Sequence, residues 1–183
     1  QRIVLQDNQG HKMELAAKDG RWMVNNKYEA REELIQYLME ALTRIASLAP
    51  VPNNAHDNVV RDIMNEHIKV QLYDAQQQLI KSYWVGDASL DNRGTYMLME
   101  LDGQPAARPH IAYLPGYQGY ITPRFNTDEE VWRSRKIFSD PAAQIKELTV
   151  QYFASPEKSF HIQRTATDSL QVQQYADTAI GYL

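Results

Sequence analysis

The sequence contains no cysteine, has no long apolar run and carries no excess of basic side chains. Without cysteine the chain can form neither a disulfide framework nor a cysteine-type zinc site, and it has no thiol nucleophile. No apolar segment approaches the roughly 18–20 residues that a membrane-spanning helix requires. Nineteen Lys and Arg against 23 Asp and Glu give a formal net charge of −4. Because nucleic-acid-binding domains normally have a basic surplus, we predict no nucleic-acid partner.

Motifs for metal binding and catalysis are also missing. The five histidines never recur at the short spacings that a metal site on a strand or helix would usually show. The sequence has no glycine-rich phosphate loop and no Gly-x-Ser-x-Gly elbow. His56 and Asp57 form the nearest polar couple, and we expect them to cap a helix. We therefore predict no metal, no cofactor and no enzyme activity, with a hydrolase built on scattered carboxylates as the least favoured alternative.

The composition is that of an ordinary globular protein, with 43% hydrophobic and 10% aromatic residues among 183. A chain of this length can bury roughly 70% of its unfolded surface and form one sizeable core. Apolar and polar residues alternate in short segments separated by turns rich in Asn, Asp and Gly, a pattern typical of antiparallel strands. We expect strands at 3–5, 13–15, 22–24, 68–72, 79–85, 95–101, 110–114, 147–153, 159–164 and 170–172.

Other segments have helical rather than strand periodicity. The longest covers 29–48, where apolar residues recur every three or four positions, and Pro50 would end it. A second helix is predicted over 57–66. The spacing of a capping box predicts a third, short helix over 127–138, and Asp140 before a proline predicts one further turn. The fold class predicted is α+β, with antiparallel β-meanders and packed amphipathic helices.

The end of the sequence resembles its beginning. Three pairs of alternating apolar residues precede the first predicted helix, and a similar order returns from residue 147, followed by helix-like spacing at Ile180 and Leu183. We therefore predict an internal repeat, with a first α+β unit at 1–140 and the start of a second, similar unit at 141–183 that packs on the first. The second copy would stop as its helix begins, so we expect these 183 residues to be either part of a longer protein or a natural truncation.

The most distinctive segment is the aromatic loop 113–125, which combines four aromatic residues with two Gly and two Pro. Flat rings beside guanidinium groups can stack on sugars, peptides or proline-rich segments. The same side chains can instead cover sheet edges and the undersides of loops, and the sequence leaves both interpretations open. The candidate ligand- or partner-binding residues are Tyr96, Tyr113, Tyr117, Tyr120, Arg124, Trp132, Arg133 and Arg135.

Six segments, taken in order, carry a resemblance to a protein family. They are KDGRWMVNNKYEAR (18–31), PVP (50–52), AHDNVV (55–60), GTYMLME (94–100), PGYQGYITPRF (115–125) and WRSRKIF (132–138). Together they lie between residues 18 and 138. They resemble a bacterial domain-of-unknown-function family, number 4340, in its Bacteroidetes branch.

The resemblance implies a location and a class of partner that composition does not show. Members of the family usually begin with one N-terminal membrane helix and place the rest of the chain outside the cytoplasmic membrane. Relatives often accompany gliding-motility-type ABC transporter components, and repeated α+β units are in keeping with the family. No catalytic residue is established for it, so none is carried over to this chain.

The expected function follows from the missing catalytic motifs and from the resemblance. We expect a non-enzymatic, envelope-associated accessory or interaction domain that binds a protein partner, with a gliding-type ABC transporter complex as its setting. The expected location is the periplasmic side of the cell envelope, with an N-terminal anchor that this chain lacks. The alternative is a carbohydrate- or peptide-binding module that uses the aromatic loop 113–125.

Overall fold

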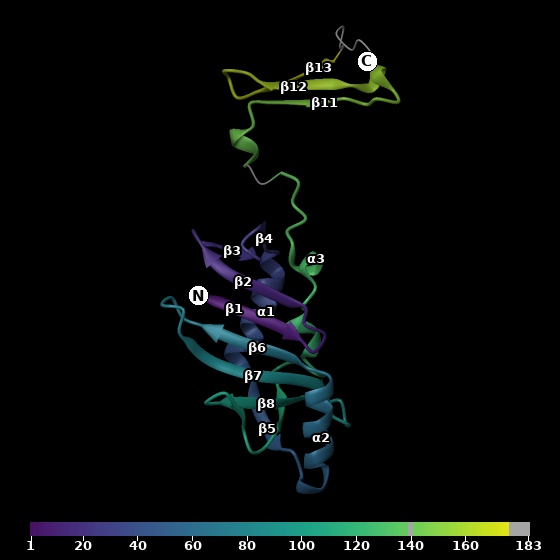
Figure 1. Ribbon diagram of the computed structural model, residues 1–183. Helices are drawn as coiled ribbons and strands as arrows, with labels where there is room; N and C mark the ends of the chain where they lie inside the picture. Colours follow the sequence, from purple (N-terminus) through teal and green to yellow (C-terminus); the bar gives the residue numbers. More distant parts are fainter. Residues whose placement is uncertain (139–140, 176–183) are drawn as a thin grey trace. The chain divides into compact units, whose positions relative to one another are not determined.

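The chain divides into two compact units in the computed structural model, which describes residues 1–138 and 141–175 (Figure 1). Unit 1 comprises residues 1–135, and unit 2 begins at Lys136. The sequence placed the boundary after residue 140 instead. The mixed α and antiparallel β architecture agrees with the predicted fold class in its coarse form.

Unit 1 is built around one large antiparallel sheet. Most of its strands coincide with the segments of alternating hydrophobicity, and the predicted strand over 95–101 is confirmed with the same bounds. The strand order is β4-β3-β2-β1-β6-β7-β8-β10-β5, and β9 pairs with β8 alone. The strands are β1 (Arg2–Asp7), β2 (Lys12–Lys18), β3 (Arg21–Val24), β4 (Tyr28–Glu29), β5 (Ala46–Pro50), β6 (Ile68–Tyr73), β7 (Leu79–Ala88), β8 (Thr95–Leu101), β9 (Gln104–Pro105) and β10 (His110–Tyr113).

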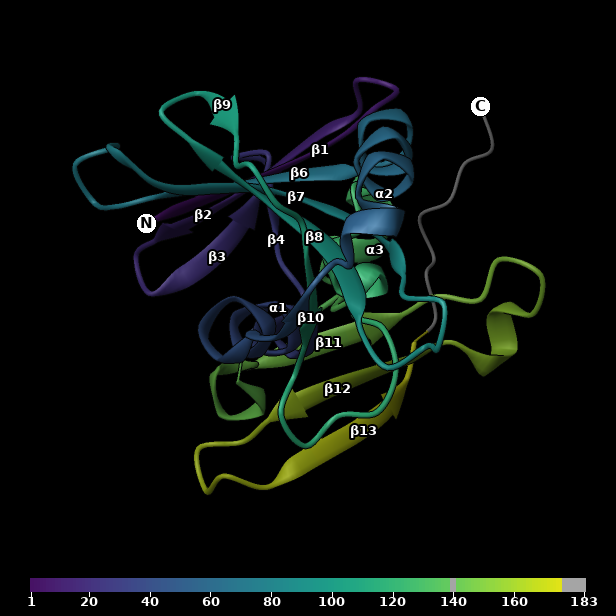
Figure 2. The same ribbon diagram turned by 90° about the horizontal axis from the view of Figure 1, so that it is seen from below.

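Two helices of equal length cover opposite faces of this sheet, α1 (Glu32–Arg44) and α2 (Asn53–Asn65) (Figure 2). The alternation of side chains along β7 shows the two faces directly. Tyr83 and Val85 join the core beneath α1, whereas Trp84 joins a smaller core beneath α2. The larger core contains buried residues of β1, β2, β6 and α1, including Ile3, Leu5, Met13, Leu15, Ile35, Leu38, Ala41 and Val70.

The first predicted helix is too long at both ends. It begins at Glu32 because residues 28–29 form β4 and pair with β3. It ends at Arg44, and residues 46–50 form the edge strand β5, which pairs with β10. Leu48 is therefore 51% exposed and does not belong to an apolar helical stripe. Pairing with a distant strand overrides the helical spacing here.

The second predicted helix was placed too late. It begins at Asn53, so His56 and Asp57 lie inside it and do not cap it. The two side chains still interact, with 2.8 Å between His56 Nδ1 and Asp57 Oδ1, and His56 Nε2 lies 3.1 Å from the carbonyl oxygen of Ala107. His56 therefore ties α2 to the segment before β10.

The third predicted helix is shorter than its pattern suggests. Its first turn is capped by Asp128, whose Oδ1 accepts a hydrogen bond from the Glu130 amide at 2.9 Å, and not by Thr127. The helix α3 (Glu129–Trp132) then stops because Arg133 forms a β-bridge with Ala30. A 3-10 turn, η1 (Thr122–Phe125), precedes it.

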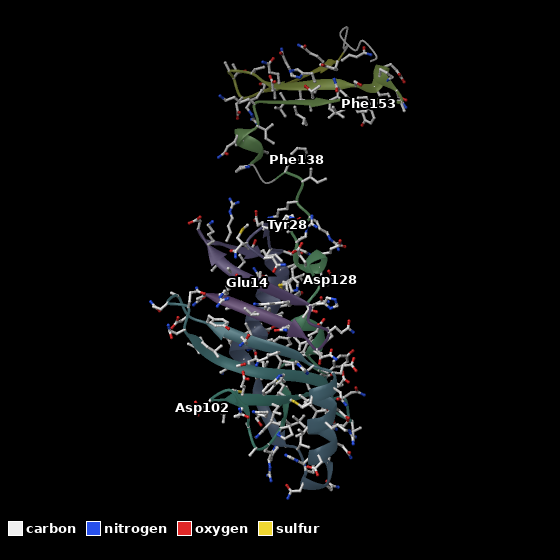
Figure 3. The ribbon with its side chains drawn as sticks, in the orientation of Figure 1. Glu14, Tyr28, Asp102, Asp128, Phe138 and Phe153 are labelled. Carbon is white, nitrogen blue, oxygen red and sulfur yellow. The ribbon has the colours of Figure 1, made fainter. Side chains whose placement is uncertain are left out.

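Unit 2 contains a three-stranded antiparallel sheet of β11 (Glu147–Val150), β12 (Phe160–Arg164) and β13 (Leu170–Gln174), with 3-10 turns η2 (Ala142–Gln144) and η3 (Pro156–Lys158). Among its described residues no hydrophobic side chain is buried, and Phe138 and Phe153, labelled in Figure 3, are 71% and 84% exposed. The predicted cap at Asp140 and the helical spacing of Ile180 and Leu183 lie outside the described residues.

Candidate functional site

The aromatic loop is fastened to the sheet of unit 1 by two hydrogen bonds and one buried ring. The amide of Ile121 donates to Thr95 Oγ1 at 2.8 Å, and the hydroxyl of Thr122 donates to the Gly86 carbonyl at 2.7 Å. Phe125 is fully buried and meets the Tyr83 ring edge-on, with 6.4 Å between ring centroids. These hydrogen bonds and the buried ring of Phe125 fix the loop backbone, so the loop has a defined shape.

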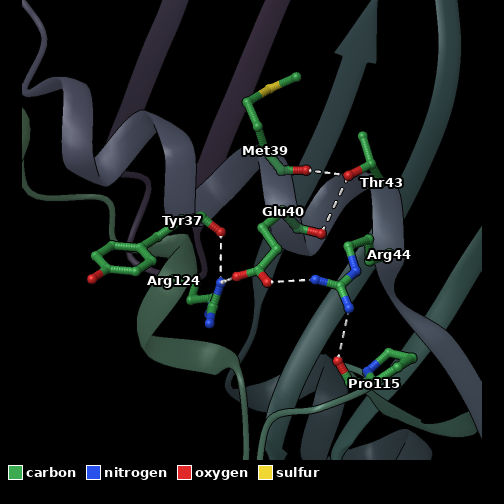
Figure 4. A network of polar contacts seen from close by, with 7 residues as sticks. All are labelled: Tyr37, Met39, Glu40, Thr43, Arg44, Pro115 and Arg124. Carbon is green, nitrogen blue, oxygen red and sulfur yellow. Dashed lines mark hydrogen bonds and ion pairs between the residues drawn. The ribbon is translucent and has the colours of Figure 1, made fainter.

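Arg124 lies at the centre of a polar network that joins this loop to α1 (Figure 4). Its Nη1 donates to Glu40 Oε2 at 2.7 Å and to the carbonyl oxygen of Tyr37 at 2.8 Å. Arg44 donates to the other Glu40 oxygen at 2.8 Å and to the Pro115 carbonyl at 3.1 Å. Charge-assisted bonds of this length are the stronger kind of protein hydrogen bond. The carboxylate of Glu40 thus links two guanidinium groups. Arg124 belongs to the loop, and Arg44 forms a hydrogen bond with the loop backbone.

The electrostatic effect of this network falls on Glu40. The hydrogen bond from Arg124 holds the pKa of the Glu40 carboxyl below its ordinary value of 4.5, and attraction to both arginines acts in the same direction. Glu40 is therefore ionised at neutral pH and balances part of the positive charge at this surface.

Two tyrosine rings flank the Arg124 guanidinium. Its central carbon lies 5.0 Å from the centroid of Tyr117 and 5.4 Å from that of Tyr37, both within the range of cation–π attraction. Tyr37 is 55% exposed and Tyr117 is 46% exposed, whereas the Arg124 side chain is 14% exposed. We call these five residues the Arg124 cluster: Tyr37, Glu40, Arg44, Tyr117 and Arg124. An inner cation thus holds two outward-facing aromatic rings in place.

The structure brings only some of the predicted site residues together. Tyr117 and Arg124 are in contact, and Tyr120, three residues along the same loop from Tyr117, is 44% exposed. Tyr113 is half-buried at the end of β10. Tyr96 packs against the core beneath α2, together with Trp84 and Leu98, on the face of the sheet opposite α1. The predicted set is therefore not one continuous surface.

Trp132 is a core residue and is not available to a ligand in this structure. It is 2% exposed, and its indole N–H donates to the Asn126 carbonyl at 2.8 Å. Arg133 stacks on the Tyr28 ring, with 3.9 Å from its guanidinium carbon to the ring centroid. Arg133 and Arg135 line an open cavity of about 470 Å³ together with Asp128 and Glu130. These three predicted residues therefore lie apart from the Arg124 cluster.

Sequence reasoning missed the residues that α1 contributes to the cluster, namely Tyr37, Glu40 and Arg44. Glu40 and Arg44 looked like ordinary members of a solvated helix face. Tyr37 was the available signal, because a large aromatic residue on the polar side of an amphipathic helix is unusual unless it has a partner. The partner, Arg124, lies 87 residues further along the chain.

The Arg124 cluster exposes two aromatic rings beside a guanidinium, and these groups can contact a ligand or a partner. Within residues 1–138 and 141–175, no group of three His, Asp or Glu side chains is placed to hold a metal ion. The Arg124 cluster holds one carboxylate between two arginines, so no acid–base pair with separated pKa values lies there. In the described part of the chain no helix is long and apolar enough to cross a membrane.

Comparisons with family models, with curated proteins and with solved structures each return no match to this chain. The resemblance to family 4340 therefore stays a prediction from the quoted segments, and the geometry of unit 1 carries the functional argument.

Proposed function

We propose that this chain is a non-enzymatic interaction module that binds a protein partner through Tyr37, Tyr117, Tyr120 and Arg124. The observation that carries the proposal is the pairing of exposed rings with a fixed cation. Tyr37 and Tyr117 are each about half exposed, yet both rings lie against a guanidinium that Glu40 holds in place.

Tyrosine and arginine are the residue types expected at the energetic centre of a protein interface. Both are enriched among residues that contribute most to binding. Tyrosine offers a large contact area with few rotatable bonds, and the planar guanidinium of arginine offers several hydrogen-bond donors. The rings of Tyr37 and Tyr117 need little further ordering on binding, since Arg124 already constrains them. The partner would contact a surface whose shape exists before binding.

The wider setting is proposed on the resemblance. We propose that the partner belongs to the cell envelope and that a gliding-type ABC transporter complex is the candidate assembly.

We also propose that unit 2 is an incomplete second copy of the first part of unit 1. The three strands of unit 2 follow the order of β1 to β3, and the register places Leu148, Ile162 and Val172 side by side, so that one face of that sheet is apolar.

The alternative of a carbohydrate or peptide ligand at the aromatic loop is favoured by the exposure of Tyr117 and Tyr120. It differs from the first proposal in the size of what is bound. A full protein interface needs about 800 Å² from each partner and would extend across α1, whereas a sugar or short peptide would contact the loop alone.

Site-specific photo-crosslinking separates these proposals. A photoreactive amino acid replaces Tyr117 in the full chain, and the control carries it at Leu79, which is 50% exposed at the start of β7. In envelope extracts we expect one discrete protein adduct at position 117 and none at position 79. A small mass increase at 117 would instead favour the sugar or peptide ligand. Equal labelling at both positions would contradict a specific surface.

A further inference from the structure

A groove in unit 1 lies between the β3–β4 hairpin and the N-terminal half of α1. It has a volume of about 410 Å³ and is lined by Gly20, Arg21, Trp22, Glu29, Ala30, Glu32, Ile35 and Gln36. Pockets that bind small molecules usually measure roughly 300–1,000 Å³. Of the three tryptophans, Trp132 is buried and Trp84 lies beneath α2, whereas Trp22 lines this groove.

The lining has an apolar part and a polar part. Ile35 and Ala30 are buried, and half-buried Trp22 packs against the main core. The polar part contains Glu32 and Gln36, one helical turn apart on α1 and both exposed. Neither side chain forms a hydrogen bond to another described residue. Two hydrogen-bonding groups thus face the groove beside an aromatic wall.

The charges of the groove restrict the class of ligand. Arg21 Nη1 lies 3.4 Å from Glu29 Oε2, and the two side chains are 65% and 36% exposed. The carboxylates of Glu29 and Glu32 outnumber the guanidinium of Arg21, so the groove disfavours an anion, and water screens the attraction of exposed Glu32 for a cation. Within the described residues the carboxylates here do not form a metal-binding group. A neutral ligand adds no charge to the groove and can still form hydrogen bonds with all of these groups.

The hydrogen-bonding inventory points to a hydroxyl-rich ligand. Arg21 can only donate and ionised glutamates can only accept, whereas the Gln36 amide does both. A hydroxyl group also donates and accepts, so a polyol ring satisfies all of these groups at once. Its apolar C–H face suits the indole of Trp22. We propose that this groove binds a neutral sugar, a site separate from the Arg124 cluster and independent of the proposed protein partner.

Ligand-detected NMR and tryptophan fluorescence on the full chain test this proposal with glucose, galactose, N-acetylglucosamine, maltose and cellobiose. We expect at least one of them to bind. Glu32→Gln replaces a charge-assisted hydrogen bond with a weaker neutral one, and Gln36→Ala removes a hydrogen bond. Each changes an exposed side chain and should weaken that binding about fivefold or more. Trp22→Ala should abolish it. Glu33→Gln is the matched control on the same helical turn, and it should bind as the unaltered chain does.

Arginine ethyl ester serves as the cationic probe in the same titrations. Tighter binding of this ester than of any sugar would overturn the proposal, and so would the absence of binding by all five sugars. If both Glu32→Gln and Gln36→Ala bind the sugar as tightly as the unaltered chain does, the sugar binds outside this groove and the proposal is wrong. Loss of the Tyr117 crosslink has no bearing on this site, so failure of one proposal is distinguishable from failure of the other.

Discussion

Replacing Phe125 tests whether the aromatic loop is fastened to the core as described. Phe125 is fully buried and follows Arg124 directly. A buried aromatic side chain removes roughly 150–250 Å² from water, which at about 25 cal/mol per Å² corresponds to about 4–6 kcal/mol. Alanine retains part of that burial, so Phe125→Ala should lower the free energy of unfolding by about 3–5 kcal/mol, the usual range for such truncations.

Thermal and urea unfolding followed by circular dichroism measure this loss. For a chain of this size each kcal/mol shifts the Tm by roughly 2–4 °C, so the Tm should fall by about 10 °C. Phe125→Leu keeps most of the volume and should cost about 1 kcal/mol, the range of conservative core replacements. Tyr117→Ala at the exposed end of the same loop should change stability by less than about 1 kcal/mol, the size of an exposed cation–π contact. A loss below about 1 kcal/mol for Phe125→Ala would refute the anchored loop.

Three further outcomes are expected. Gly94→Ala should lower the Tm in thermal unfolding, because an added Cβ would lie 2.5 Å from the Ala112 carbonyl oxygen. Partial burial tends to raise the pKa of Asp7, but hydrogen bonds with His11 and Thr127 together outweigh it and lower that pKa below its ordinary value of 3.8. Asp7 therefore stabilises the fold above about pH 3.8 and loses this effect as the pH falls through its lowered pKa, so Asp7→Asn should weaken the pH dependence of the Tm there. In hydrogen exchange, the described strands of unit 2 should exchange their amides faster than the central sheet in unit 1, because no described hydrophobic side chain of unit 2 is buried. Equal protection of the two sheets would contradict this reasoning.

Periodicity predicted the strands well and the ends of the helices poorly, for a physical reason. The strand at 95–101 has apolar residues on both faces and pairs with neighbours on either side, so pattern and pairing agree. Residues 46–48 continue the helical spacing of α1, but their pairing with β10 is a contact between distant segments. Arg133 likewise leaves α3 to bridge with Ala30. Local patterns contain no information about such pairings.

Only part of the candidate site was predicted, because some of its contacts also join segments that are distant in the sequence. Tyr117 and Arg124 belong to one unusual loop, so composition alone drew attention to them. Glu40 contacts Arg124 across 84 residues of sequence, which no local pattern reveals. Trp132 shows the opposite error, because an aromatic residue suits a core and a binding surface equally well, and only its burial decides.

Hydroxyl-radical footprinting is the most direct test of the proposed surface. In the free chain we expect strong oxidation of Tyr37, Tyr117 and Tyr120 and protection of Trp132. Addition of the protein identified by crosslinking should protect Tyr37 and Tyr117 and leave oxidation at Leu79 unchanged. Unchanged oxidation of both tyrosines in that complex would contradict the claim that the Arg124 cluster is the binding surface.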